Sequence, residues 1–200
     1  MALQDPQDGG AEVNTQTRAF ICSGHMIDTP GRKKPRFPPS KEQPVRTSMA
    51  QLLRRWGVGA HDVAICGGAR GADIIFAEEC LKLATRVVLL IALPEEEFLA
   101  RSVRLPASDW ETRYRALRDR CETHFQHEEW ADRHPDVDVF SRNNIWCLEK
   151  AYAMVSPENV FGLLVWDERP TGDGPGGTSD FANRIRARGG KVAIVNPTRL

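Results

Sequence analysis

The chain has 200 residues, of which 41% are hydrophobic and 27% are charged, and its 27 Lys and Arg residues balance its 27 Asp and Glu residues. A chain of this length can bury a sizeable core and suits one globular domain. The formal net charge of zero argues against a broad surface for nucleic acid or membrane, so any anion has to be bound locally. No stretch reaches the roughly 20 apolar residues that cross a bilayer.

The chain has an odd number of cysteines and no Cys-x-x-Cys pair, and most of them lie within apolar segments: Cys22, Cys66, Cys80, Cys121 and Cys147. They predict buried free thiols in a reducing compartment, and residues 1–17 lack the apolar core of a signal peptide, so we expect a cytoplasmic protein. His124 and His127 are three residues apart, but no cysteine or carboxylate set completes a metal site. We predict no metal and no cofactor.

Residues 1–17 are polar without periodicity and predict a flexible N-terminal segment, which leaves residues 18–200 as a single domain. The domain opens with a short apolar strand at residues 18–22, followed by the small polar residues Ser23, Gly24 and His25. Residues 26–41 are rich in proline and in Lys and Arg. They predict an irregular basic loop, either a lid over a phosphate or a solvated linker.

Short apolar runs and segments of helical periodicity alternate along the rest of the domain. The expected strands are residues 62–66, 86–93, 137–140, 160–166 and 191–195, and the expected helices are residues 42–56, 74–83, 109–121, 145–155 and 178–188. This alternation predicts an α/β fold, a Rossmann-like three-layer sandwich with a mainly parallel central sheet and helices on both faces. Ligands of such sheets bind at the carboxyl ends of the strands.

The glycine-rich stretch at residues 67–73 lies where the second strand turns into a helix. Glycine lets the backbone approach a ligand closely, and the N–H groups at a helix N-terminus attract an anion, so this turn is a candidate phosphate site. A tight turn without a ligand is an equally good interpretation. Arg70 is either a ligand contact or one half of an ion pair with Glu78, and Asp73 either caps the helix or binds a ribose hydroxyl.

Two further helix starts follow. Arg142 and Asn143 precede the apolar repeat that begins at Ile145, and a second glycine-rich turn at residues 172–178 opens the last helix. In a parallel sheet these helix N-termini converge with the first turn, and together they can hold one anion.

These three motifs, in this order, resemble the SLOG superfamily of Rossmann-like domains. The superfamily includes the cytokinin-activating phosphoribohydrolases of the LOG type, the DNA-processing protein A family and the nucleotide-sensing domains of bacterial immune systems. Residues 67–73 are especially similar to the Gly-Gly-Ala-x-Gly-Ala-Asp pattern of its YspA-like branch, and the resemblance covers residues 18–197. It implies a nucleotide-derived ligand bound by Ser23, Gly24, His25, Gly67, Gly68, Ala69, Arg70, Gly71, Asp73, Arg142, Asn143, Gly174, Gly176, Gly177 and Thr178.

The last motif departs from the LOG pattern at the position of the catalytic glutamate. An alignment on Gly177 and Thr178 puts Phe181 there, whereas Asp180 lies one residue earlier, which rotates its side chain by about 100° on a helix. Asp180 is therefore only a weak catalytic candidate, and the sequence favours binding over hydrolysis.

The leading hypothesis is a sensor of a nucleotide signal that acts through a separate effector protein or by forming a homo-oligomer, as in bacterial immune or signalling systems. The alternative is a nucleoside monophosphate N-ribohydrolase with Asp180, Asp73 or Glu79 as acid or base. DNA binding is disfavoured by the zero net charge.

Overall fold

The structure is a computed structural model that describes residues 16–169 and 177–200. Residues 1–15, which make up most of the predicted flexible segment, lie outside the described residues. Six strands form one sheet in the order β4-β3-β2-β1-β5-β6, and every neighbouring pair is parallel. The strands are β1 (Ala19–Gly24), β2 (Val63–Cys66), β3 (Arg86–Ile91), β4 (Glu122–Phe125), β5 (Val160–Val165) and β6 (Lys191–Val195).

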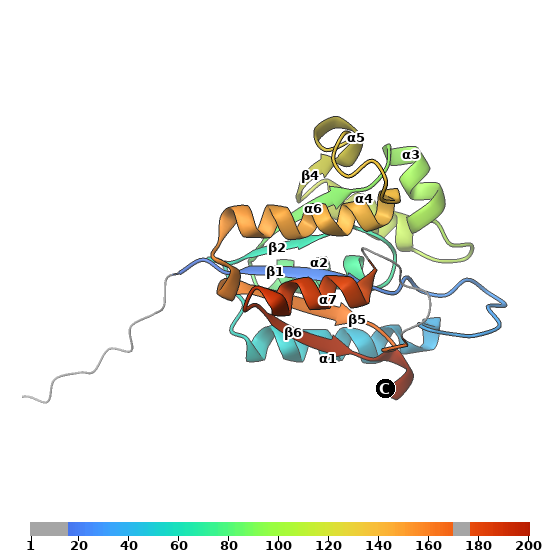
Figure 1. Ribbon diagram of the computed structural model, residues 1–200. Coiled ribbons are helices and arrows are strands. Elements are labelled where there is room, and N and C mark those ends of the chain that lie inside the picture. The colour runs from blue at the N-terminus through green and yellow to red at the C-terminus, as the bar shows by residue number, and fades with distance from the viewer. Residues whose placement is uncertain (1–15, 170–176) are drawn as a thin grey trace, which may run out of the picture.

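Helices cover both faces of the sheet, which confirms the predicted three-layer α/β sandwich (Figure 1). One face packs against α1 (Glu42–Arg55), α2 (Ala72–Lys82) and α4 (Trp110–Arg118). The other face packs against α6 (Val139–Met154) and α7 (Thr178–Ala187). The shorter elements are η1 (Pro39–Lys41), α3 (Glu95–Phe98), η2 (Leu99–Val103), α5 (Gln126–Glu129), η3 (Pro157–Asn159) and η4 (Pro197–Arg199).

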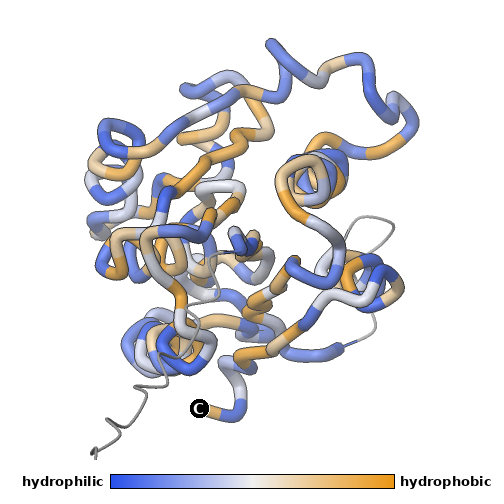
Figure 2. The backbone as a smooth tube through the Cα atoms, turned by 90° about the vertical axis from the view of Figure 1, so that its left-hand side faces the viewer, coloured by the Kyte–Doolittle hydropathy of each residue, from blue (hydrophilic) through white to orange (hydrophobic). Residues whose placement is uncertain are grey.

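The central strands are mostly apolar because both of their faces are covered. All residues of β2 and β5 are buried, as are five of the six residues of β1 and of β3. Hydrophobic segments concentrate in the interior, whereas the outer turns of the helices are mainly hydrophilic (Figure 2). The apolar strand runs of the sequence therefore predicted the centre of the sheet correctly.

The predicted secondary structure was wrong in two places, at the start of α6 and at the β4 edge of the sheet. Residues 137–140 were expected to form a strand, but the Asp138 side chain accepts hydrogen bonds from the backbone N–H groups of Phe140 and Ser141 and caps α6, which begins at Val139. Arg142 and Asn143 consequently lie inside α6 and not at its first residue. The strand β4 was missed because its residues are polar and only half-buried.

The turn between β2 and α2 lies against the chain that leaves β1. Gly71 has a φ of 94°, and a Cβ atom built on it would lie 2.6 Å from the backbone nitrogen of Ile27 and 2.9 Å from the carbonyl oxygen of His25. Backbone atoms cannot move aside as a flexible side chain can. Only glycine therefore fits here, for reasons of both backbone conformation and space.

We predict that Gly71→Ala lowers the free energy of unfolding by at least about 2 kcal/mol, because the strained φ alone costs about 1–3 kcal/mol. Urea denaturation measures the change. Gly59→Ala is the matched control, since the φ of Gly59 is not positive and no atom lies within 4 Å of its added Cβ. Equal stability of the two variants would contradict this account of Gly71.

Candidate functional site

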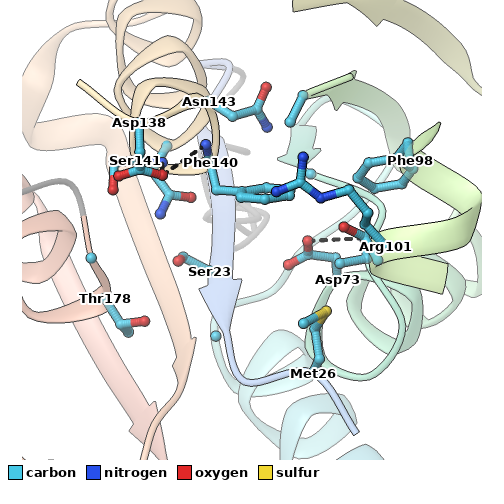
Figure 3. Close-up of a pocket in the computed structure, with 17 residues that line it drawn as sticks. Ser23, Met26, Asp73, Phe98, Arg101, Asp138, Phe140, Ser141, Asn143 and Thr178 are labelled. Atoms are coloured by element: carbon cyan, nitrogen blue, oxygen red, sulfur yellow. Dashed lines mark hydrogen bonds between the residues drawn. The ribbon is translucent and has the colours of Figure 1, made fainter. Parts of the chain in front are cut away.

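A pocket of about 620 Å³ opens at the carboxyl ends of the strands (Figure 3). Its walls come from the residues that follow β1, β2 and β3, from the first turn of α6 and from the start of α7. The chain runs from β1 to β2, β3 and β4 on one side and returns to β5 and β6 on the other, so β1 and β5 flank the topological switch point of the sheet. Open α/β sheets bind their ligands at this place.

The glycine-rich turn contributes its own aspartate to the pocket wall. The backbone N–H group of Ala69 donates to Asp73 Oδ2 (N···O 3.2 Å), and the N–H group of Gly67 also donates to this carboxyl group. A Cβ atom on Gly67 would lie 3.0 Å from the same oxygen. The turn is thus folded around an internal carboxyl group, which satisfies N–H groups that the sequence analysis assigned to a phosphate.

Burial raises the pKa of Asp73 from its usual value to about 7, and the hydrogen bonds from Ala69 and Gly67 offset only part of this effect. The carboxyl group is partly exposed to the pocket. Near neutral pH it therefore presents a carboxyl group that can give or accept a proton there.

Two hydroxyl groups line the pocket next to the switch point. Ser23 is the penultimate residue of β1 and Thr178 begins α7; the two residues are only 6% and 8% exposed, and both line the pocket (Figure 3). Within the described residues neither hydroxyl group has a hydrogen-bond partner. Neither oxygen is among the buried polar atoms that lack a partner, so both hydroxyl groups are accessible from the pocket. They can donate to a ligand that accepts hydrogen bonds.

The N-terminus of α7 lies beside these hydroxyl groups. Its N-cap residue is Gly177, which has no side chain to accept a hydrogen bond from the first turn. The helix has ten residues, and its positive end favours an anion. Of the second glycine-rich motif, Gly177 and Thr178 line the pocket, whereas Gly174 and Gly176 lie outside the described residues.

The predicted pair Arg142 and Asn143 separates in the structure. Asn143 is buried and lines the pocket, but its Nδ2 donates to the carbonyl oxygen of Leu90 (2.7 Å) and its Oδ1 accepts from Gln126 (3.3 Å). Asn143 thus fixes α6 to the end of β3. Arg142 is not part of the pocket wall, because it donates to Gln126 Oε1 (2.8 Å) and to the carbonyl oxygen of Ala131 (3.1 Å).

Gly24, Gly67 and Ala69 line the pocket, but four other predicted site residues do not: His25, Gly68, Arg70 and Gly71. Arg70 is buried, and its Nε donates to the carbonyl oxygen of Ile27 (3.3 Å). The suggested ion pair with Glu78 is absent from the described residues, because Glu78 binds Arg46 and Arg113. The Nε2 atom of His25 lies 3.1 Å from Asp167 Oδ1, so His25 helps to join the ends of β1 and β5.

The three candidate catalytic carboxylates also separate. Asp73 lines the pocket, whereas Asp180 forms an ion pair with Arg184 (2.7 Å) and Glu79 forms ion pairs with Arg46 and Lys82. Phe181, at the position of the glutamate in LOG enzymes, is 1% exposed and packs in the core between α7 and the sheet. A glutamate at that position would be buried in apolar surroundings.

The basic loop lies mainly beside a second cavity. Asp28 accepts hydrogen bonds from the N–H groups of Arg36 and Phe37, and Phe37 is fully buried, which closes the base of the loop. The loop and residues 105–110 line a cavity of about 860 Å³. Of residues 26–41, only Met26 lines the first pocket, and the predicted lid function stays a prediction.

Several pocket residues were not predicted as site residues from the sequence: Met26, Ala92, Phe98, Arg101, Ser102, Asp138, Phe140, Ser141 and Asn144. Three of them come from the short elements α3 and η2, four come from the start of α6 and its cap, and two lie in loops. One of these, η2, is a π-helical turn, in which the N–H group of Arg104 donates to the carbonyl oxygen of Leu99 (2.7 Å). Such turns are frequent at functional sites, but no residue pattern marked this one.

No protein-family model and no curated protein matches this chain. Among residues 16–169 and 177–200, no group of three or more His, Cys, Asp or Glu residues could hold a metal ion. No helix in the same part of the chain is both long enough and apolar enough to cross a bilayer.

The raised pKa of Asp73 predicts a specific dependence of stability on pH. The pKa is about 7 in the folded chain and about 3.9 in an unfolded chain, so between these values the folded state holds more protons. The Asp73 contribution to the free energy of unfolding is therefore most favourable below about pH 4 and decreases as the pH rises to about 7. Asp73→Asn removes this titration.

Urea denaturation at pH 5 and pH 7.5 measures the difference in stability between parent and variant. We expect the parent to lose stability relative to Asp73→Asn as the pH rises, by up to about 1.4 kcal/mol per pH unit. Parallel pH profiles of the two proteins would show that Asp73 ionises in its ordinary range.

Proposed function

We propose that this protein binds a nucleotide or nucleotide-derived ligand in the pocket at the strand ends, with a ligand phosphate beside Ser23 and Thr178. The observation that carries the proposal is a pair of hydroxyl groups that line the pocket next to the N-terminus of α7 and have no hydrogen-bond partner within the described residues. A phosphate accepts hydrogen bonds both from hydroxyl groups and from the free N–H groups of a helix N-terminus, and the positive end of the helix favours its negative charge.

Three further points support the proposal. The pocket lies at the switch point of a parallel sheet, its volume of about 620 Å³ is within the usual range of small-molecule sites, and the sequence motifs resemble those of the SLOG superfamily. That resemblance also suggests a signalling role. We propose that ligand binding is passed on to an effector protein or to a second copy of this chain.

We predict that Ser23→Ala and Thr178→Val each weaken the binding of a 5′-nucleotide about 10- to 100-fold, because a hydrogen bond to a charged group contributes about 1.5–3 kcal/mol. Isothermal titration calorimetry with AMP, GMP, CMP and UMP measures the change. Ribose 5-phosphate serves as the probe for the phosphate and sugar alone.

Thr47→Val is the matched control, because Thr47 is exposed on α1 and lies outside the pocket. Arg142→Ala is a second control that separates the pocket from the sequence motif, and it should leave affinity within about twofold. If both hydroxyl variants fold normally and bind the nucleotide with unchanged affinity, the phosphate does not lie beside Ser23 and Thr178.

Asp73 favours a second candidate function, the hydrolysis of an N-glycosidic bond. In such a step the bond between C1′ and the base nitrogen breaks, Asp73 gives its proton to the leaving base, water adds to C1′, and the proton released by water returns to Asp73. A general acid works best with a pKa near the working pH, which the value of about 7 satisfies.

We predict that the parent chain releases free base from nucleoside monophosphates more slowly than about 1 s⁻¹, the lower end of usual enzyme turnover. The reason is that a water-activating carboxylate does not occupy the Phe181 position. Chromatography of the released base measures the rate. Faster release that falls about 100-fold or more in Asp73→Asn, but not in Asp180→Asn, would make hydrolysis the function instead.

A further inference from the structure

The pocket wall includes large apolar side chains as well as the two hydroxyl groups. The described chain exposes three large hydrophobic side chains, and two of them, Met26 (39% exposed) and Phe140 (36% exposed), line the pocket. Phe98 lines it as well. Exposed apolar residues that gather at a pocket mark a place where a ligand removes them from water.

A cationic side chain meets the Phe140 ring at this wall. The guanidinium carbon of Arg101 lies 5.0 Å from the centroid of the Phe140 ring (Figure 3). Phe140 comes from the first turn of α6, which Asp138 caps, and Arg101 comes from the π-helical turn η2. Two elements that are far apart in sequence are therefore joined by one ring contact in the pocket.

We propose that this wall is the subsite for the base, where a planar base stacks on Phe140 while Arg101 donates hydrogen bonds to its edge. The inference rests on the proposed function, which leaves open where the base lies. It orients the nucleotide, with its base between Met26, Phe98 and Phe140 and its phosphate at Ser23 and Thr178.

Charge and polarity favour a base here over a second phosphate. Arg101 Nη1 lies 2.9 Å from Glu97 Oε1, so much of its charge is already compensated, and the glutamate repels another anion. Phe140, Phe98 and Met26 offer no donors to phosphate oxygens. A neutral aromatic ring instead gains from stacking on phenylalanine and from a guanidinium group at its edge.

The test compares nucleotides with ribose 5-phosphate by calorimetry on the parent, Phe140→Leu and Arg101→Ala. Leucine keeps an apolar side chain but removes the ring. For the tightest of AMP, GMP, CMP and UMP we expect Phe140→Leu to weaken binding about 5- to 100-fold, as for one lost base stack. Arg101→Ala should weaken it as well. The affinity for ribose 5-phosphate should stay within about twofold in both variants.

The chain offers a matched control for Arg101. Arg118 also pairs with a glutamate, Glu95 (3.3 Å), and its guanidinium carbon lies 5.4 Å from the Phe125 ring, but it lies outside the pocket. Arg118→Ala should leave nucleotide affinity unchanged. Nucleotide affinities that are the same in the parent, Phe140→Leu and Arg101→Ala would overturn the base subsite alone. An equal loss for nucleotide and ribose 5-phosphate would do the same. No binding of any probe to the parent would overturn the proposed function and, with it, this subsite.

Discussion

The carboxyl group of Asp73 holds the turn between β2 and α2 by accepting hydrogen bonds from backbone N–H groups of Ala69 and Gly67. The rest of the pocket depends on this turn. Gly71 brings it into contact with the chain that leaves β1, and a Cβ atom on Gly67 would lie 3.4 Å from Asn143 Nδ2, so α6 packs directly above it. Because the turn uses its own N–H groups on an internal carboxyl group, the proposed function assigns the phosphate to Ser23 and the start of α7 instead.

Ion pairs within the protein hold several arginine side chains that could otherwise bind an anion. Arg46 and Arg113 are held by Glu78, Arg36 lies 3.3 Å from Asp167, and Arg184 pairs with Asp180. These ion pairs compensate the positive charges of the four arginines, in a chain whose formal net charge is zero. Hydroxyl groups and a helix N-terminus carry no full charge, so their interaction with a phosphate depends less on salt than an exposed ion pair does. A site of this kind discriminates by shape and hydrogen bonding more than by charge.

The sequence allowed the centre of the fold to be predicted but only part of the site. The apolar runs of β1, β2, β3 and β5 are unambiguous because both faces of these strands are buried. The polar edge strand β4 gives no such signal. Position next to a motif also does not determine where a side chain points: Arg142 is drawn away from the pocket by Gln126 and by the carbonyl group of Ala131, both distant in sequence. Arg101 and Phe140 become neighbours only through the tertiary fold.

The two candidate functions, nucleotide binding and hydrolysis of the N-glycosidic bond, use the same pocket residues and differ in whether that bond is broken. In the proposed binding mode, with the phosphate at Thr178 and the base at Phe140, the ribose would lie near Ser23 and Asp73. Figure 3 shows Ser23 between Thr178 and Phe140. A nearby phosphate disfavours ionisation of Asp73 and keeps it protonated, so the carboxyl group can donate a hydrogen bond to the ligand. Such a donor stabilises a bound nucleotide without any reaction. Asp73 becomes a catalytic acid only if its proton reaches the nitrogen of the leaving base and a second group activates water. In the alignment with the LOG motif, Phe181 takes the place of the glutamate, and its buried ring cannot activate water. We therefore propose that a nucleotide in this pocket is bound without being cleaved.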